Sequence, residues 1–356
     1  MCREGGYYYQ PTSTFLYFAA GVLADFVCFT GICLVRTGEA VVDQTTVDTA
    51  SGWFRYVALT FILLFAVAIA GFKILGANSL LPPPPLVGTP CIDVKLEFLR
   101  YSDLSEVTLA GVGSSATWRN LEMAPFLGDD RKVINAAPCH LRIHETSYYT
   151  NLLLELAPRI DTIIIVLAPR DFEHCEANTA EFMNTWLAKR YIRRQVPAWV
   201  PFLLNPRLGY ILSQAQRRTS GDPSAEEAQS LGVLDEYGTS VMKEPVDWRP
   251  PIAINEACYA ALGQFSSDLA ARDVQLVVAT IPIMPEWADM FDPDREKIAA
   301  WTERVEAELS GTAIFLDGQK YQWEDEAFVD PVHLMPPYAQ ELSQLIAHKM
   351  QQEKPD

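Results

Sequence analysis

One run of seven residues, Thr162-Ile163-Ile164-Ile165-Val166-Leu167-Ala168, limits what this chain can fold into more than any other stretch. Its β-branched side chains favour an extended strand, in which successive side chains point to opposite faces. Because both sets of side chains are apolar, both faces of this strand are expected to be buried. That pattern is typical of a central strand in a parallel sheet that helices cover on both sides.

Other segments alternate between strand-like and helix-like patterns around this run. Strands are predicted over 107–112, 132–136, 274–281 and 313–317, and helices over 145–157, 256–272, 295–309 and from Pro336 onward. The alternation predicts an α/β fold: a three-layer α/β/α domain over residues 91–350 with a parallel, flavodoxin-like sheet. Residues 172–250 lack a convincing strand and are interpreted as an insertion over the carboxyl ends of the strands, where ligands bind in such folds.

Two apolar runs precede this domain, over residues 14–35 and 56–72. Each approaches the roughly 20 residues that a membrane-spanning helix needs. The second run carries no charge, whereas the first contains Asp25, which is costly in a bilayer. We therefore expect residues 1–80 to anchor the chain in the cell membrane as a two-helix hairpin, with a single span as the alternative.

Residues 81–90 contain four consecutive prolines and are predicted to form a stiff, extended stalk. Few basic residues flank the apolar runs, but the loop 36–55 holds two of them, Arg36 and Arg55. The positive-inside rule then favours a cytoplasmic loop and an extracytoplasmic body.

The net charge of −17 disfavours nucleic acid and anionic lipid as partners of the body, because both attract clustered Lys and Arg. Of seven cysteines, four fall in the body and no two form a CxxC pair: Cys91, Cys139, Cys175 and Cys258. They are either buried free thiols or two disulfides, and a Cys139–Cys175 bond is one candidate pairing.

Two short motifs can carry chemistry. In Asp330-Pro331-Val332-His333 the carboxylate can accept a hydrogen bond from one imidazole nitrogen, which leaves the other nitrogen free to take a proton. Gly113-Ser114-Ser115 follows the first predicted strand and precedes a helix, a place where backbone N–H groups can stabilise an oxyanion. Both motifs are predicted to lie at the carboxyl edge of the sheet.

At these residues the chain resembles the SGNH, or GDSL-like, hydrolase superfamily, over roughly residues 105–350. Gly113-Ser114-Ser115 is similar to the family's first sequence block, and Asp330-Pro331-Val332-His333 to its last. The resemblance implies an acyl-Ser intermediate without cofactor or metal, in which His333 deprotonates Ser115 and Asp330 orients His333.

The anchor and the insertion are similar to the branch that moves acyl groups onto envelope polymers, such as proteins of alginate O-acetylation and D-alanyl transfer. This implies a membrane-anchored serine esterase or O-acyltransferase, with O-acetyl as the expected acyl group. Its partners would be an acyl donor, an envelope or exopolysaccharide carbohydrate as acceptor, and a membrane acyl-transfer protein. A non-catalytic binding subunit of a polysaccharide modification or export complex is the alternative.

The chain departs from the family at the oxyanion donors. The family supplies a Gly and an Asn, whereas this chain has Asn135-Ala136 after the second strand and Arg170 after the central strand. Arg170 and Asn135 are the candidate side-chain donors, and Ala136 is the third candidate of the oxyanion site.

Two other clusters have competing interpretations. His140, His144 and His174, with Cys139 and Cys175, contain ligand types that bind zinc, although no carboxylate motif completes the set. The basic, aromatic segment from Trp186 to Tyr210 is either a membrane-surface or acceptor-groove element, or an amphipathic helix with a solvated basic face.

Overall fold

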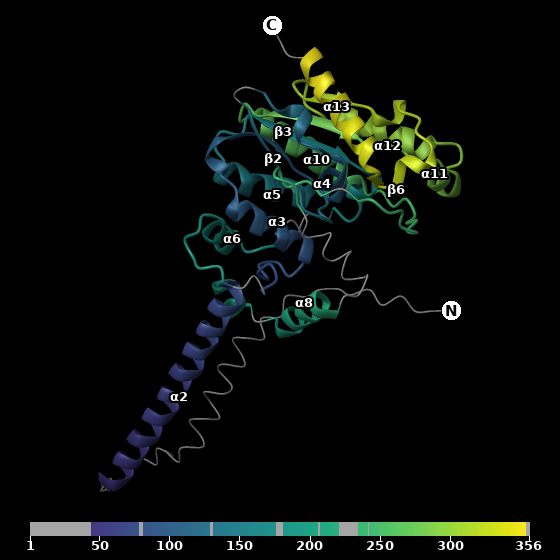
Figure 1. The fold of residues 1–356 in the computed structure, drawn as a ribbon. Coiled ribbons are helices and arrows are strands. Elements are labelled where there is room, and N and C mark those ends of the chain that lie inside the picture. The colour runs from purple at the N-terminus through teal and green to yellow at the C-terminus, as the bar shows by residue number, and fades with distance from the viewer. Residues whose placement is uncertain are drawn as a thin grey trace, which may run out of the picture. The chain divides into compact units, whose positions relative to one another are not determined.

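The fold is taken from a computed structural model, which describes residues 44–77, 81–128, 131–175, 181–205, 207–220, 234–240 and 242–353. It divides the chain into two units, residues 1–66 and 67–356, which are treated separately. The strands are β1 Val107–Gly111, β2 Lys132–Asn135, β3 Thr162–Leu167, β4 Gln275–Thr280, β5 Ile314–Leu316, β6 Phe328–Asp330 and β7 His333–Leu334. The helices of ten or more residues are α2 Gln44–Ala77, α3 Pro90–Tyr101, α5 Ile143–Leu156, α8 Leu208–Ser220, α10 Glu256–Ala270, α12 Glu296–Ala307 and α13 Pro336–Gln352 (Figure 1). Shorter α-helices are α4 Ser115–Asn120, α6 Thr185–Ile192, α7 Val200–Leu204 and α11 Pro285–Phe291.

The first five strands form one parallel sheet in the order β2-β1-β3-β4-β5. This is the flavodoxin-like order, which reverses direction between β1 and β3. In the register, Ile164 of β3 lies beside Gly111 of β1 and Val277 of β4. The five predicted strands are therefore confirmed, with β3 in the centre, and their carboxyl ends lie at one edge.

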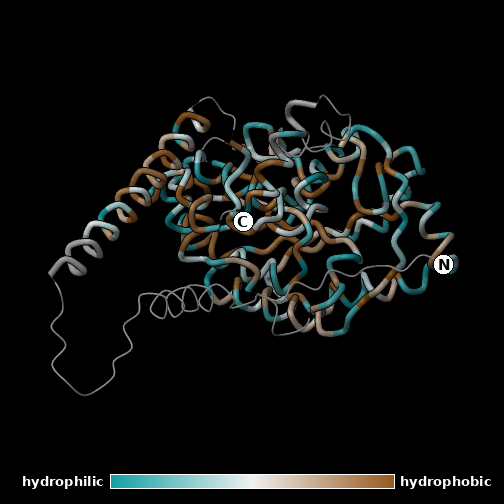
Figure 2. Tube along the Cα trace, turned by 90° about the horizontal axis from the view of Figure 1, so that it is seen from below, coloured by the Kyte–Doolittle hydropathy of each residue, from teal (hydrophilic) through white to brown (hydrophobic). Residues whose placement is uncertain are grey.

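The alternation of side chains along β3 separates two hydrophobic cores. Ile163 and Ile165 pack in one core with residues of α3, α5 and α10. Ile164 and Val166 pack in the other core with residues of α4 and α13. Helices therefore cover both faces of the sheet, as the apolar run predicted, and Figure 2 shows hydrophobic segments running through the middle of the body.

Helix α2 contains a stretch, Gly52–Gly76, whose 25 residues and mean hydropathy of 2.4 suit a membrane span. This stretch includes the predicted run 56–72. The helix starts earlier than predicted, at Gln44, so the second half of the predicted loop 36–55 is helical. The other predicted span, 14–35, lies outside the described residues.

The proline segment is held against other parts of its own unit. Pro82, Pro84 and Pro85 are buried, and the carbonyl of Pro85 accepts a hydrogen bond of 2.9 Å from Asn205. The carboxylate of buried Asp93 accepts the N–H groups of Val87 and Gly88, both at 2.8 Å. Residues 81–90, predicted as a stiff, extended stalk, are thus packed against other residues of the same unit.

The four body cysteines form two disulfides, Cys91–Cys139 and Cys175–Cys258, with Cα–Cα distances of 5.8 and 5.0 Å. The interpretation as free thiols and the candidate pairing Cys139–Cys175 are therefore both wrong in this structure. Each bond ties a helix to a loop that follows a strand: α3 to the loop after β2, and α10 to the loop after β3. The two disulfides thereby fix loops at the carboxyl edge of the sheet.

Candidate active site

The turn between β1 and α4 presents the two serines. Gly113 has a φ of +130°, and an added Cβ there would clash with the hydroxyl of Thr117, so the turn requires glycine. Ser114 caps α4, because its Oγ accepts the N–H of Ala116 at 3.1 Å. Ser115 follows as the first residue of α4 and is half-buried.

Helix α4 is attached to the central strand by one side chain. The hydroxyl of Thr117 donates to the carbonyl of Val166 at 3.1 Å and accepts the N–H of Val166 at 2.9 Å. Thr117 is fully buried, so neither bond competes with water. The position of the two serines is therefore coupled to β3.

Asp330 and His333 form the predicted pair. One carboxylate oxygen of Asp330 lies 2.7 Å from Nδ1 of His333. The other oxygen accepts the N–H groups of Val332 and His333, at 2.9 and 3.0 Å, which fixes the carboxylate. Both side chains are buried. Nε2 of His333 is also buried and has no hydrogen-bond partner among the described residues, so it is the ring nitrogen that could take a proton.

Asn120, at the end of α4, joins this hairpin to the serine helix. Its fully buried side chain donates to the carbonyl of Val332 at 2.8 Å and accepts the N–H of Leu334 at 2.8 Å. One amide thus holds the chain on both sides of His333. Sequence reasoning missed this residue, and the signal available to it was only a polar residue at the end of a short helix.

Asp171 links the two halves of the site. Its side chain bonds to Ser114, and its carboxylate accepts the N–H of Ala168 at 2.9 Å. Burial raises the pKa of Asp171 to about 6, against the hydrogen bonds and the charges of Arg142 and His333, which lower it. Asp171 therefore lies near the serine turn and near His333. No hydrogen bond joins Ser115 to His333 in the described part of the chain, so the role of Ser115 in a triad with this pair stays a prediction.

The predicted oxyanion donors after β2 point elsewhere. Nδ2 of Asn135 donates to the carbonyl of Leu121 at 2.9 Å, and the N–H of Ala136 donates to the carbonyl of Gly111 at 2.9 Å. The amide of Asn135 therefore caps the end of α4, and the N–H of Ala136 belongs to the sheet.

Arg170 remains available as a donor. Its guanidinium stacks on the ring of Trp248, 4.5 Å from the ring centre. Among the described residues it forms no ion pair and no hydrogen bond. Its charge also lowers the pKa of His140, together with burial, which contributes most, and the charges of Arg142 and His333. Arg170 therefore lies on the same side of the molecule as His140 and His333.

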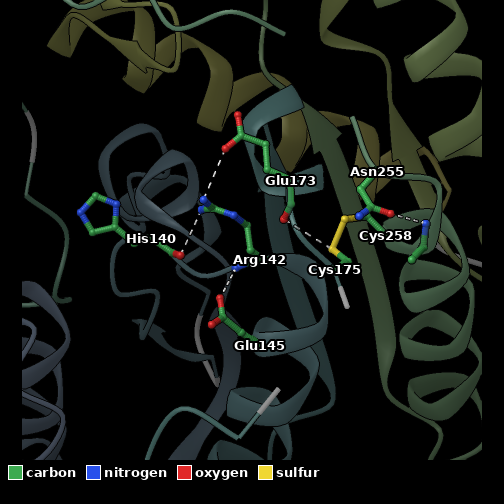
Figure 3. Close-up of a disulfide and its surroundings, with 8 residues drawn as sticks. His140, Arg142, Glu145, Glu173, Cys175, Asn255 and Cys258 are labelled. Carbon is green, nitrogen blue, oxygen red and sulfur yellow. Dashed lines mark hydrogen bonds and ion pairs between the residues drawn. A yellow bond between two sulfur atoms is a disulfide. The ribbon is translucent and has the colours of Figure 1, made fainter. Parts of the chain in front are cut away.

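A second arginine, Arg142, joins the loop after β2 to the loop after β3. Figure 3 shows Arg142 between the carbonyl of His140 and the carboxylate of Glu173, to which it binds at 3.3 and 3.4 Å. The carboxylate of Glu145 accepts the N–H of Arg142 at 2.7 Å and so starts α5. The disulfide of Cys175 lies two residues beyond Glu173, which fixes the same loop (Figure 3).

The histidine–cysteine constellation considered for a metal is not assembled among the described residues. The potential ligands that gather there are Cys91, Cys139 and His140. The two sulfurs are bonded to each other, so they are not thiolates that could bind a metal.

No family model matches the chain, and no curated protein matches it. Among solved structures, a chain described as "a putative platelet activating factor from Streptococcus pneumonia" is similar, with 12% identity and a TM-score of 0.38. The similarity covers 80% of this chain and 98% of that chain.

Proposed function

We propose that the protein is a membrane-anchored serine esterase or O-acyltransferase of SGNH-like type that acts on envelope carbohydrate through an acyl-Ser intermediate. The observation that carries the proposal is the buried Asp330–His333 pair next to the helix that begins with Ser115; within the described ranges, Nε2 of His333 has no partner. A carboxylate on Nδ1 favours the tautomer that leaves Nε2 as an acceptor. His333 would then deprotonate Ser115, which attacks the acyl carbonyl, and return the proton to the leaving group.

The structure supports Arg170 as the donor to the oxyanion in this proposal. A guanidinium that stacks on an aromatic ring keeps its N–H groups free in the plane, and Arg170 has no carboxylate partner among the described residues. Removal of one oxyanion donor usually lowers kcat about 100-fold or more. Arg170→Ala is expected to have that effect, whereas Arg159→Ala, which removes an exposed arginine paired with Glu106 at the other edge of the sheet, is expected to change kcat little.

The enzyme is tested with a fluorophosphonate probe on the full-length protein in detergent. Labelling of Ser115 is expected, and Ser115→Ala and His333→Ala are each expected to abolish it. Ser114→Ala removes the helix cap and the hydrogen bond to Asp171 but leaves the proposed nucleophile, so it should retain labelling. If labelling instead persisted in Ser115→Ala and disappeared in Ser114→Ala, the nucleophile would be Ser114.

The alternative is a non-catalytic binding subunit of a polysaccharide modification complex. The observation that favours it is that, in the parts of the chain that the structure describes, no hydrogen bond joins Ser115 to His333. Absence of both labelling and hydrolysis of an aryl acetate, in protein that remains folded, would establish this alternative over the enzyme. An O-acyltransferase would acylate an added oligosaccharide even though water competes for the acyl-enzyme, whereas an esterase would only hydrolyse the acyl donor.

A further inference from the structure

Three helices end at one place on the body, away from His333. They are α3, α5 and α6, whose last residues are Tyr101, Leu156 and Ile192. A cavity of about 150 Å³ lies there, lined by Leu99, Arg100, Ser102, Leu104, Leu156, Ile192, Arg193 and Arg194. Residues 102–104 lead into β1, so the cavity lies at the amino-terminal edge of the sheet, opposite the candidate active site.

Each helix end is capped by an arginine from another helix or its flank. Arg100 donates to the carbonyl of Tyr191, in the last turn of α6. Arg194 donates to the carbonyl of Arg100 at 2.8 Å, in the last turn of α3. Arg193 donates to the carbonyl of Glu155 at 3.0 Å, in the last turn of α5. In each guanidinium group one nitrogen donates to a helix carbonyl, and the other nitrogens take no part in this capping.

The three arginines keep unused donors at this place. A helix C-terminus carries about half a negative charge, so the capped helix ends offset part of the positive charge of the guanidinium groups. None of the three arginines forms an ion pair with a carboxylate in the described parts of the chain, although the protein as a whole has a net charge of −17. The guanidinium groups therefore line the cavity with N–H donors that no carboxylate occupies.

Arg100 is the most buried of the three arginines. Its side chain is only 9% exposed, and its Nε is buried without a hydrogen-bond partner among the residues that the structure describes. A buried guanidinium with unused donors is costly unless an acceptor reaches it. Leu99, Leu104 and Ile192 supply an apolar wall beside it, which suits a short carbon chain attached to the acceptor.

We propose that this cavity binds a phosphate group, carried by a small phosphate ester or by a lipid headgroup. Guanidinium groups bind phosphate oxygens in pairs, and a phosphate offers several negatively charged acceptor oxygens to the unpaired donors of the cavity. The site is independent of the proposed esterase activity, because it lies at the other edge of the sheet and uses none of the same residues.

The test measures thermal unfolding of the full-length protein in neutral detergent while phosphate replaces chloride at constant ionic strength. A saturable rise in Tm of about 4 °C is expected near 100 times Kd. Arg193→Gln with Arg194→Gln should abolish the rise, and Arg193→Lys with Arg194→Lys should keep most of it. Arg272→Gln, an exposed arginine before β4, is the matched control and should respond like wild type. Phosphate also stabilises most proteins weakly, because it is excluded from the protein surface. The proposal is therefore judged by the difference in the rise of Tm between the variants.

A second arm distinguishes the source of the phosphate. Nanodiscs of phosphatidylglycerol and of phosphatidylcholine are compared in phosphate-free buffer. A rise confined to phosphatidylglycerol and lost in the double Gln variant identifies a lipid headgroup, whereas a rise with free phosphate in detergent identifies a soluble ligand. An equal response of wild type and the double Gln variant in both arms would overturn the proposal.

Discussion

Asp330 is the residue on which the geometry of the proposed triad depends most directly. It accepts two backbone N–H groups and holds Nδ1 of His333, so its charge fixes both the turn and the tautomer. Asp330→Asn keeps the shape but replaces an acceptor with an N–H donor. If the protein is the proposed enzyme, hydrolysis of an aryl acetate should fall by about 10³–10⁴-fold. A variant that stays folded and keeps a tenth of the wild-type rate would show that Asp330 does not act through His333.

Asn120 is expected to combine a structural and a positioning role. Asn120→Ala removes two hydrogen bonds and leaves the carbonyl of Val332 and the N–H of Leu334 buried without partners. The free energy of unfolding should fall by about 2–4 kcal/mol, measured in urea, and esterase activity should fall with it. Asn184→Ala, which removes the cap of α6, is the control and should cost about 1 kcal/mol without loss of activity. Unchanged activity in Asn120→Ala would show that the hairpin holds His333 unaided.

The raised pKa of Asp171 predicts how the free energy of unfolding depends on pH. Its pKa is about 6 in the folded protein, mainly because burial disfavours the charged form, and about 3.9 in an unfolded chain. Below about pH 4 both states are protonated. As pH rises from about 4 to 6 the unfolded state loses its proton first, so the free energy of unfolding falls, by roughly 3 kcal/mol in total, and levels off above pH 6.

Asp171→Asn is expected to lack this fall. The measurement compares urea unfolding at pH 4.5 and pH 7.5 for wild type, for Asp171→Asn and for Asp294→Asn, an exposed aspartate that serves as control. The same difference between the two pH values in all three proteins would mean that Asp171 is ionised throughout this range.

At the scale of elements, the two disulfides tie helices to the loops that carry the site. The Cys175–Cys258 bond closes 83 residues, and such a crosslink stabilises a fold by about 4 kcal/mol through the entropy of the unfolded chain. Cys175→Ser with Cys258→Ser should therefore lower the free energy of unfolding by that order. Thiol titration of the denatured, unreduced wild type should find at most three thiols, since four of the seven cysteines are bonded. More than three would contradict the pairing.

The elements that were predicted from the sequence are those in which apolar residues recur without interruption at the spacing of a strand or a helix. All five sheet strands lay where predicted, because buried parallel strands are apolar on both faces. Helix α3 was missed because its buried face includes Asp93 and Lys95, which are both fully buried. These charged residues interrupt the apolar pattern by which a helix is recognised in a sequence. The contacts that explain them are distant in sequence: Lys95 bonds to the carbonyls of Asn135 and Gly238.

The site itself was predictable in part for a similar reason. The Asp330–His333 pair is local in the sequence, because a spacing of three residues is enough to bring the two side chains together. The direction of a side chain at a strand end depends on the neighbouring helix, so Asn135 could be placed at the right edge but not assigned its contact with α4. Asp171 and Asn120 act across the site, between segments far apart in the chain, and no spacing pattern marks them.

At the scale of the whole molecule, the disulfides and the apolar helix bear on which side of a membrane the body occupies. Disulfides persist in oxidising compartments and are rare in the cytosol of most cells. A body with two of them, joined to a helix long and apolar enough to span a bilayer, fits the extracytoplasmic location proposed from the charges around the span.

This location can be tested on intact cells with a membrane-impermeant, amine-reactive biotin reagent. Lys320, whose side chain is 77% exposed, and Lys132, which is 59% exposed, should be labelled without permeabilisation because both lie on the body. The control is a cytosolic protein of the same cells, which should be labelled only after permeabilisation. Labelling of Lys320 only after permeabilisation would place the body in the cytoplasm. Its cysteines would then face a reducing environment, and a carbohydrate acceptor outside the membrane could not reach His333.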